Sequence, residues 1–421
     1  MQESIKPKTG KIISGTRCRR CYIKKGNEMS SQYSWRAPQF ALAIWVGALS
    51  FAPCVAIAGG FSRGEADTDI LFTDGNYSLR TGAIYVSPSR SFSTLNGARA
   101  SDKAYSDEFW IPSVAVKATL GSGIACALTY TQPFGASATY GSQAQNAEYT
   151  TASSQGLALV NPTSKMQFST DEYGATCDVR VDAGPGRFYM IGGVFLESFE
   201  YKENTLYGNI RLKDDGALGY RVGAAYDIPE YAMRFQLMYR SQVSHDAEGT
   251  FTPSALAAAA GVTDTAPANG TGTLPQSIKL SAQTGVAPGW LVYGSLTWTD
   301  WSVLQNFRYD VTGLGTSNKA FNYKDGYTVQ IGVGHEFTEK LSGTVNVTWD
   351  EGVGTGADIT TDTWSLGLGA EYKTKFGKFD LGTSVSYLTA GSQSVSAGAT
   401  YDATAKHDWA VAVGLGYLIE F

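Results

Sequence analysis

The side chains that carry most enzyme and metal chemistry are sparse in this chain. Its three histidines are His245, His335 and His407, and none stands at metal-ligand spacing from a second potential ligand. No grouping of serine, histidine and aspartate can be supported from the sequence alone, although such triads need not be local. The sequence therefore predicts no metal, no cofactor and no catalytic site, with an outer-membrane lipase as the alternative.

Cysteine chemistry is equally limited. Cys18 and Cys21 form a C-x-x-C in a basic N-terminal stretch, and a lone pair of this kind is weak evidence for metal or redox chemistry. Beyond residue 58 only Cys126 and Cys177 remain, which excludes a disulfide-dense scaffold.

The elements that must position any site are β-strands, and the last one is the clearest. Every second residue from 409 to 421 is apolar or aromatic, whereas the residues between them are mostly small or charged. A period of two places these sets on opposite faces of a strand. An apolar face with aromatic residues near both ends, on a chain that stops at Phe421, is typical of a lipid-facing strand of an outer-membrane barrel.

Residues 1–58 are separate from this pattern. The stretch 37–58 is mostly apolar, follows Arg36 and ends in Ala56-Ile57-Ala58, which predicts a signal peptide cleaved near Ala58. The basic residues before it are either an upstream extension ahead of a true start at Met29 or an unusually long n-region that begins at Met1.

Charge and composition restrict the partners. Residues 1–58 hold nine basic and two acidic residues, so the remaining 24 basic and 36 acidic residues give a net charge of −12. Such a chain is not expected to bind nucleic acid. Aromatic residues make up 12% and glycines number 48, which suits interfacial aromatic belts and a strand-rich fold with many turns.

Beyond residue 77 the chain reads as strand, turn, strand, and short turns alternate with long connections. We predict an all-β fold, a transmembrane antiparallel β-barrel of about 14 strands over 78–421, with a short N-terminal plug at 59–77. An even strand count closes the sheet, as hydrocarbon requires. The alternative is a secreted β-sandwich or β-helix. The predicted strands cover 78–89, 108–119, 123–134, 166–182, 187–201, 216–228, 231–243, 274–287, 290–308, 323–336, 340–350, 362–373, 378–389 and 407–421.

The two remaining cysteines fall on neighbouring predicted strands, near the same periplasmic end. Cys126 shares its apolar face with Ile124, and Cys177 shares its face with Val179. Because the periplasm permits disulfides, the pair is either a cross-strand disulfide or two small lipid-facing residues.

Four segments resemble the FadL family of outer-membrane transporters for long-chain fatty acids and hydrocarbons. They agree with it in order and spacing over nearly the whole chain beyond residue 80. The resemblance implies a plugged fourteen-stranded barrel, an apolar groove on the extracellular loops, a deeper pocket and a lateral gap where an early strand kinks inward. The hatch here is short and lacks the Asn-Pro-Ala segment usual in the family. The four segments are 109–135, 220–251, 274–307 with its W-x-x-W-S cluster, and 323–353.

The resemblance also implies a ligand site. Lys319 matches the family lysine that contacts the bound acid, and the second family cation falls near Lys202, among Glu197, Glu200 and Glu203. Phe321, Phe199 and Trp301 are candidates to line the pocket for the hydrocarbon chain. The alternative interpretation makes the lysines solvated loop residues and the aromatic residues girdle or packing residues.

We therefore expect a monomeric barrel in the bacterial outer membrane, in contact with its lipid, that takes up long-chain fatty acids or similar hydrophobic compounds by passive diffusion. A general diffusion porin or adhesin-type barrel, and an uptake channel for aromatic hydrocarbons, are the alternatives. A porin would have a polar lumen and no apolar groove.

Overall fold

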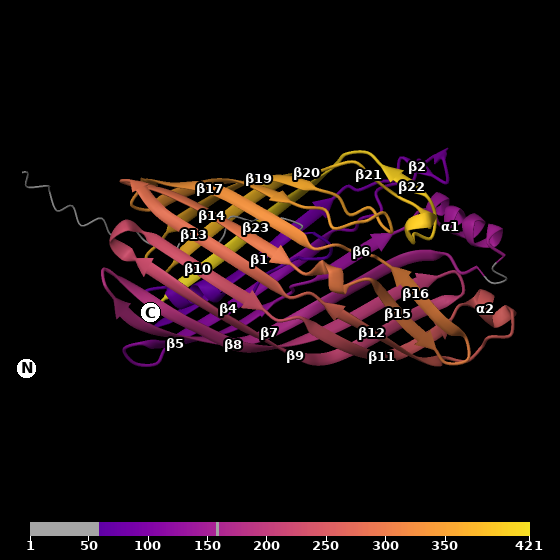
Figure 1. The fold of residues 1–421 in the computed structure, drawn as a ribbon, viewed down its shortest axis with the longest axis horizontal. Coiled ribbons are helices and arrows are strands. Elements are labelled where there is room, and N and C mark those ends of the chain that lie inside the picture. The colour runs from indigo at the N-terminus through magenta and orange to yellow at the C-terminus, as the bar shows by residue number, and fades with distance from the viewer. Residues whose placement is uncertain (1–58, 157–159) are drawn as a thin grey trace, which may run out of the picture. The chain divides into compact units, whose positions relative to one another are not determined.

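The chain forms a closed antiparallel β-barrel in a computed structural model that describes residues 59–156 and 160–421. Strand β1 (Tyr77–Pro88) pairs with β4 (Phe109–Thr119) on one side and with β23 (Asp408–Glu420) on the other, so the last strand returns to the first (Figure 1). The sheet therefore closes on itself, as a wall in hydrocarbon requires.

Fourteen passes make up the wall, and five of them are split into two strands. The predicted antiparallel barrel of about 14 strands is thus confirmed. The remaining wall strands are β5 (Ile124–Thr131) with β6 (Gly135–Thr139), β7 (Thr163–Ala183), β8 (Gly186–Thr205), β9 (Gly208–Ile228), β10 (Met233–Arg240) with β11 (Val243–Pro253), β12 (Ala266–Leu274) with β13 (Ser277–Ala287), β14 (Trp290–Thr299) with β15 (Asn306–Val311), β16 (Gly315–Ala320) with β17 (Gly326–Thr338), β18 (Leu341–Asp350), β19 (Thr363–Lys373) and β20 (Lys378–Leu388).

Small elements cap the end of the barrel opposite the short turns. Helix α1 (Ser142–Ser154) and helix α2 (Ala255–Ala259) lie there with a small sheet (Figure 1), whose strands are β2 (Thr94–Leu95), β3 (Ala98–Arg99), β21 (Gly391–Gln393) and β22 (Ala403–Ala405). Among the described residues, no helix is long and apolar enough to cross a membrane.

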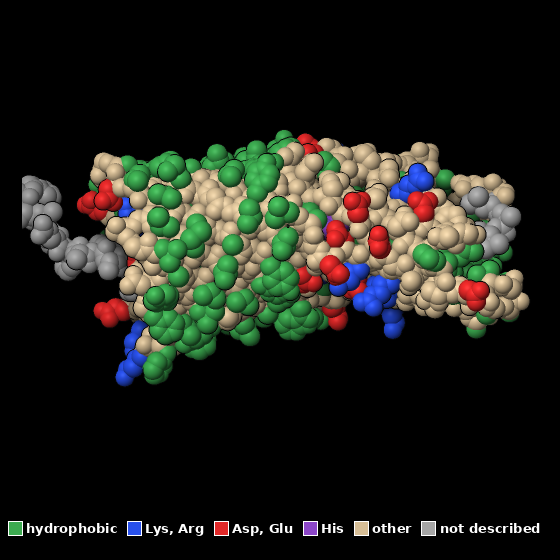
Figure 2. Space-filling view, turned by 90° about the horizontal axis from the view of Figure 1, so that it is seen from below, with side chains coloured by type: hydrophobic (Ala, Val, Ile, Leu, Met, Phe, Trp, Pro, Cys, Tyr) green, Lys and Arg blue, Asp and Glu red, His purple; other side chains and the backbone are tan. Residues whose placement is uncertain are grey.

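The outward face changes character halfway along the longest strands. On β8, Met190, Val194 and Leu196 are exposed apolar residues, and the next outward residues are Ser198, Glu200 and Lys202. Figure 2 shows the same division, with hydrophobic side chains gathered over one half of the surface and charged ones over the other. The apolar half is the lipid-facing band, and the other half extends beyond it on the extracellular side.

This division explains where the predicted strands were wrong. The segments 202–215, 244–273 and 309–322 were expected as long loops, but they contain the hairpins β8–β9, β11–β12 and β15–β16. Alternation continues there, but with polar outward residues, because these strands stand in water rather than lipid. A search for apolar faces therefore ends the strands too early.

An N-terminal segment, residues 59–76, occupies the lumen. Its 3₁₀ helix (Thr68–Phe72) buries Ile70, Leu71 and Phe72 against inward residues of the wall. Asp67 accepts hydrogen bonds from Arg80 at 2.8 and 2.9 Å, and the Lys279 ammonium lies 2.5 Å from a Glu65 carboxylate oxygen. Ion pairs to separate strands thus hold the segment inside the barrel. The proposed extension and signal peptide, residues 1–58, lie outside the described residues.

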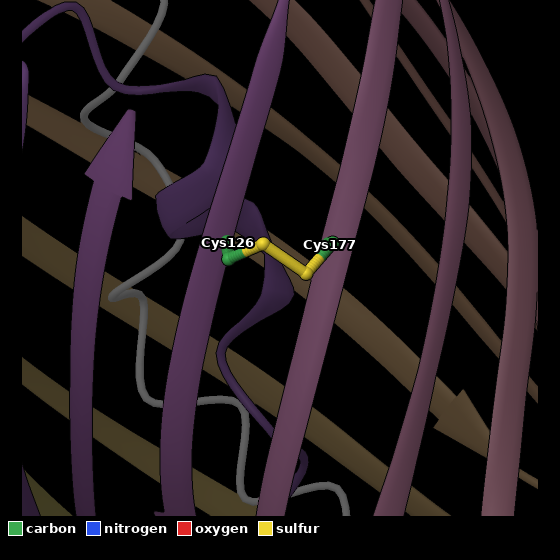
Figure 3. Close-up of a disulfide and its surroundings, with 2 residues drawn as sticks. All are labelled: Cys126 and Cys177. Carbon is green, nitrogen blue, oxygen red and sulfur yellow. A yellow bond between two sulfur atoms is a disulfide. The ribbon is translucent and has the colours of Figure 1, made fainter. Parts of the chain in front are cut away.

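Cys126 on β5 and Cys177 on β7 stand directly opposite each other, and the structure joins them in a disulfide (Figure 3). The residues on either side of Cys126 on the same face, Ile124 and Leu128, are 43% and 65% exposed, so the pair lies on the lipid-facing surface.

We predict that Cys126→Ser lowers the free energy of unfolding by about 2–4 kcal/mol, because the disulfide closes a long loop in the unfolded chain. Urea unfolding of the refolded barrel, followed by tryptophan fluorescence, measures the loss. Cys177→Ser and the double variant should show the same loss, and reductant should abolish the difference from wild type. Equal stability of all four proteins would contradict a bridge that contributes to the fold.

Candidate functional site

An apolar pocket opens in the extracellular half of the lumen, with about 650 Å³ of empty space that includes its open mouth. Its walls come from residues of seven strands, β6, β7, β8, β11, β12, β15 and β16, and from Phe61 of the N-terminal segment. The lining residues on which the following paragraphs depend are Phe61, Phe168, Phe199, Tyr201, His245, Phe307, Lys319 and Phe321.

Three of the predicted site residues line this pocket: Lys319, Phe199 and Phe321. Trp301 does not line it, because its fully buried ring lies beneath, 6.0 Å from the ring of Phe61. Lys202 does not reach it either. Its ammonium lies 2.6 Å from Glu200 on the outer face of β8, because neighbouring residues of a strand point to opposite faces.

A buried carboxylate, Glu203, stands beside Lys319 at the pocket wall and is 1% exposed. Lys319 Nζ donates to Glu203 Oε1 at 2.7 Å, Thr163 Oγ1 donates to the same oxygen at 2.7 Å, and the hydroxyls of Tyr201 and Tyr309 donate to Oε2 at 2.9 and 2.7 Å. The carboxylate thus has four donors, which fill its acceptor sites.

Both members of this pair stay charged. Burial tends to lower the pKa of Lys319, but the attraction of Glu203 and Glu148, together with the hydrogen bond to Glu203, outweighs it and raises that pKa above the ordinary value. Burial tends to raise the pKa of Glu203, but the charge of Lys319 and the hydrogen bonds from Lys319, Thr163 and Tyr309 together outweigh it and lower the pKa. At neutral pH the pocket wall therefore holds a closed ion pair.

The floor of the pocket is an aromatic cluster around Phe61. Its ring centroid lies 4.9 Å from that of Phe168, 5.2 Å from Phe321 and 5.6 Å from Tyr323. The preceding residue, Gly60, has φ +66°, and a Cβ there would lie 2.7 Å from the Trp301 ring, so only glycine fits. One step earlier, the backbone nitrogen of Gly59 donates to the buried carboxylate of Asp350. The N-terminal segment therefore closes the pocket from below.

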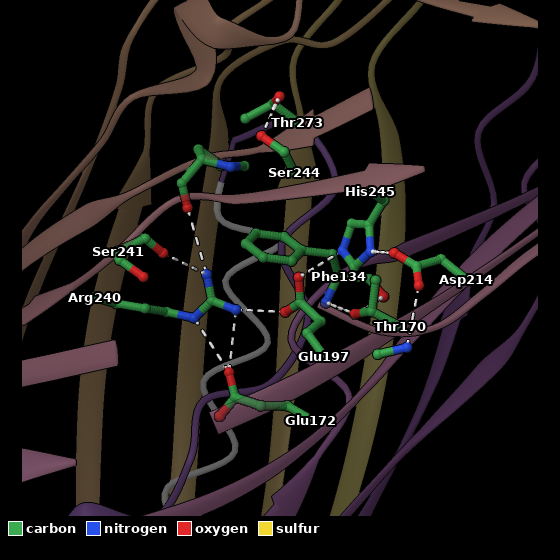
Figure 4. A network of polar contacts seen from close by, with 12 residues as sticks. Phe134, Thr170, Glu172, Glu197, Asp214, Arg240, Ser241, Ser244, His245 and Thr273 are labelled. Carbon is green, nitrogen blue, oxygen red and sulfur yellow. Dashed lines mark hydrogen bonds and ion pairs between the residues drawn. The ribbon is translucent and has the colours of Figure 1, made fainter. Parts of the chain in front are cut away.

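A charged network lies under the other side of the pocket (Figure 4). His245 Nδ1 is 2.8 Å from Asp214 Oδ2, and its Nε2 is 3.2 Å from Glu197 Oε1. Glu197 also accepts from Arg240, which donates to Glu172 at 3.1 Å. The imidazole stacks on Phe199, with ring centroids 5.4 Å apart. One pocket wall thus rests on a chain of buried ion pairs.

This network should make stability depend on pH. Burial tends to lower the pKa of His245, but the hydrogen bonds to Glu197 and Asp214, together with the negative charges of these carboxylates, outweigh it and raise the pKa above its ordinary value. A raised pKa means that the imidazolium stabilises the fold fully below about pH 6.5 and that this contribution is lost as the pH rises through the folded pKa.

We therefore predict that His245→Gln destabilises the barrel by about 1.5–3 kcal/mol below about pH 6.5, and by less in alkaline buffer. Urea unfolding of wild type and variant across this range measures the difference. His407→Gln, at a histidine with an exposed side chain, is the control. A difference independent of pH would contradict the protonated pair.

The wall beside the pocket is interrupted between β4 and β6. The β4–β5 ladder ends at the pair Ser113–Thr131, so Phe109–Pro112 pair with β1 alone among the described strands. Higher up the wall closes again, where Asp107 N donates to Ser137 O at 3.0 Å. Pro112, which has no N–H, lies within the interruption.

The N-terminal segment fills this interruption from the lumen. The guanidinium carbon of Arg63 lies 4.0 Å from the Phe109 ring centroid. A Cβ on Gly135 would lie 2.7 Å from the same guanidinium carbon. Gly64 follows, and a Cβ there would lie 2.6 Å from Thr131 Oγ1. Arg63 and Gly64 thus bridge β4 and β6 at the place where those strands do not pair.

Sequence reasoning missed Glu203, Tyr201, His245 and Phe61 as site residues. For Glu203 and Tyr201 a signal exists, since they continue the inward set of β8 that contains Phe199. The sequence 60–64 also has the letters G-x-S-x-G of a hydrolase elbow. Ser62, however, lies in an extended bridge to Phe134 rather than on a strand-to-helix turn.

The family model described as "Outer membrane protein transport protein (OMPP1/FadL/TodX)" matches residues 69–351. A long-chain fatty acid transport protein of Salmonella typhi is 26% identical over 145 residues, 32% of this chain and 33% of that protein. The match therefore spans about a third of that relative's length.

Solved structures share the fold. A Pseudomonas aeruginosa FadL homologue superposes with a TM-score of 0.67 at 13% identity, over 87% of this chain and 96% of that one. The toluene transporters TodX of Pseudomonas putida and TbuX of Ralstonia pickettii both superpose with a TM-score of 0.53, at 13% and 12% identity. They cover 86% and 83% of this chain and 96% and 90% of their own.

Proposed function

Because this chain belongs to the OMPP1/FadL/TodX family of outer-membrane transport proteins, we propose that it takes up hydrophobic small molecules through the pocket in its extracellular half. Members of this family are transport proteins rather than enzymes, and they reside in the outer membrane as β-barrels. The observation that carries the proposal is the apolar pocket, which opens outward and is closed below by Phe61. One chain supplies all its walls, which supports a monomer as the working unit.

Uptake through such a pocket needs no energy source. Burial of each methylene group contributes ~0.8 kcal/mol, so a hydrophobic molecule binds without strong polar contacts. The interruption between β4 and β6 lies beside the pocket, because Ala136 and Ala138 of β6 line it. We propose that the bound molecule leaves sideways there, into the lipid, once Arg63 and Gly64 move aside.

Two substrate classes come into consideration. The Salmonella relative is named for long-chain fatty acids, the class expected from the sequence, and TodX and TbuX are named for toluene. The pocket lining favours including aromatic hydrocarbons as a second candidate, because five phenylalanine rings line the cavity. They are Phe61, Phe168, Phe199, Phe307 and Phe321.

The test is uptake of labelled oleate and labelled toluene by cells that lack their own transporter and produce this protein. We expect uptake of at least one compound with wild type and loss of that uptake with Gly272→Phe. Gly272 lines the pocket, and a Cβ there would already lie 3.3 Å from Phe307.

Gly192→Phe is the matched control, because Gly192 faces outward and a Cβ there meets nothing within 4 Å. Heat-dependent migration on gels checks that each variant is a folded barrel. Uptake of neither compound by folded wild type, or equal uptake by the two glycine variants, would contradict the proposal.

A further inference from the structure

We propose that this pocket selects uncharged hydrophobic molecules over carboxylates, because Glu203 already occupies the anionic position beside Lys319. The inference rests on the proposed function and names its substrate class. A fatty acid brings one carboxylate, which must find a cation when it leaves water. The question is therefore whether the pocket has a cation to offer.

Two described lining residues can carry positive charge, Lys319 and His245. The ammonium of Lys319 donates to Glu203 at 2.7 Å and lies 3.4 Å from Thr163 Oγ1. Both ring nitrogens of His245 face carboxylates, Asp214 at 2.8 Å and Glu197 at 3.2 Å. Each cation of the pocket thus already has an internal anion.

The internal anion of Lys319 is held firmly. Glu203 is 1% exposed and receives four hydrogen bonds from separate parts of the fold: Lys319, Thr163, Tyr201 and Tyr309. A ligand carboxylate would have to draw the ammonium away and leave a buried carboxylate without its counter-charge, which is the costly way to break a buried pair.

The net charge around Lys319 is unfavourable as well. Glu148 of α1 accepts from the backbone nitrogen of Thr163 at 2.9 Å, and the hydroxyl of the same threonine donates to Glu203. Glu148 also attracts the Lys319 ammonium, so two carboxylates lie near one cation. A ligand carboxylate would add a third negative charge, whereas an alkane, an arene or an alcohol adds none.

The first experiment needs only wild type. Purified protein is loaded with the uncharged fluorescent probe N-phenyl-1-naphthylamine, which is then displaced by decanol or by decanoate, two chains that differ at the head group. At about pH 8 we expect decanol to displace the probe at a concentration about tenfold lower, because the carboxylate meets like charge. At about pH 4 decanoic acid is largely neutral, and the difference should nearly disappear.

The second experiment removes the internal anion. Glu203→Gln keeps the shape of the side chain and frees Lys319, so we expect displacement by decanoate to improve about tenfold at pH ~8, while decanol changes little. In the Glu203→Gln background, Lys319→Met should abolish the gain. Glu200→Gln is the control, because Glu200 pairs with Lys202 and Arg211 on the outer face.

Three outcomes would overturn the inference: decanoate displacing the probe as well as decanol at pH ~8, a preference independent of pH, or a folded Glu203→Gln protein with unchanged selectivity. The wild-type measurements decide the matter even if Glu203→Gln does not fold. Failure of the proposed function would look different, since a folded wild-type barrel would then bind neither the probe nor either chain.

Discussion

Replacing Arg240 with alanine is expected to lower the free energy of unfolding of the barrel by about 3–5 kcal/mol. The guanidinium donates to Glu197 and lies 3.1 Å from Glu172, and these side chains are 0% and 2% exposed. It also stacks over Phe195, with the guanidinium carbon 4.5 Å from the ring centroid. Truncation leaves two buried carboxylates with less counter-charge and opens space beside a buried ring.

Arg308→Ala is the matched control. Arg308 lies 3.6 Å from Asp310, but the two side chains are 61% and 46% exposed, so its loss should cost under about 1 kcal/mol. Urea unfolding of the refolded proteins measures both losses. If Arg240→Ala lowers the free energy of unfolding as little as Arg308→Ala does, water must reach the carboxylates, and the ion pairs of Arg240 do not stabilise the barrel as a buried network would.

A second variant tests whether the unpaired charge and the lost bulk together account for this loss. Arg240→Met with Glu197→Gln removes one charge of each sign and retains bulk over Phe195. It should recover part of the stability lost in Arg240→Ala, because a removed pair costs less than an unpaired buried charge. No recovery would show that neither the unpaired charge nor the lost bulk over Phe195 accounts for the loss.

The barrel itself was predictable from the sequence because lipid imposes a strong pattern. Residues that face hydrocarbon must be apolar, whereas the residues between them face a crowded lumen. Alternation such as that of 409–421 therefore predicts a strand and also which of its side chains point to the lipid and which to the lumen. The fourteen passes and their short turns follow from it. The outer-membrane location follows as well, since an inverted pattern with an apolar outside suits no aqueous compartment.

The extracellular half was less predictable, for the same reason. On β8 the inward set Glu197, Phe199, Tyr201 and Glu203 continues without a break, whereas the outward set changes from apolar to charged after Leu196. A loop at this place would not assign neighbouring residues to opposite faces, so Lys202 and Glu203 could not be told apart as surface and lumen residues. The strand separates them completely: Glu203 binds Lys319 in the lumen, and Lys202 lies on the surface.

The partners of the inward arginines show a different limit. Arg221 and Arg240 point inward and pair with Glu172 and Glu197 of other strands, not with a carboxylate of their own strand. Asp227 pairs with Arg187, while Arg234 pairs with Asp69 of the N-terminal segment. Partner choice across a lumen depends on strand stagger and on what fills the barrel, and neither is encoded in the period of a single strand.

The position of the N-terminal segment leads to the second large effect. Phe61 O accepts from Gly135 N at 2.9 Å, Arg63 N donates to Pro133 O at 2.8 Å, and Ser62 stands opposite Phe134 between them. Opposed residues of this non-hydrogen-bonded kind have Cα atoms about 4.5 Å apart, close enough for a disulfide. A cysteine at each of positions 62 and 134 should therefore fix the segment to the wall.

We predict that oxidised Ser62→Cys/Phe134→Cys protein takes up substrate about tenfold more slowly than the same protein after reduction, while probe binding stays similar. The physical reason is that Phe61 closes the pocket floor and Arg63 fills the interruption between β4 and β6, so a bound molecule leaves only when both move. The variant lacks the Phe134 ring in both redox states, so the difference in uptake between the two states reports the cross-link alone. Wild type with and without reductant accounts for the Cys126–Cys177 disulfide. Full cross-linking with undiminished uptake would show that the molecule leaves without displacing this segment, and the exit would then have to lie elsewhere in the wall.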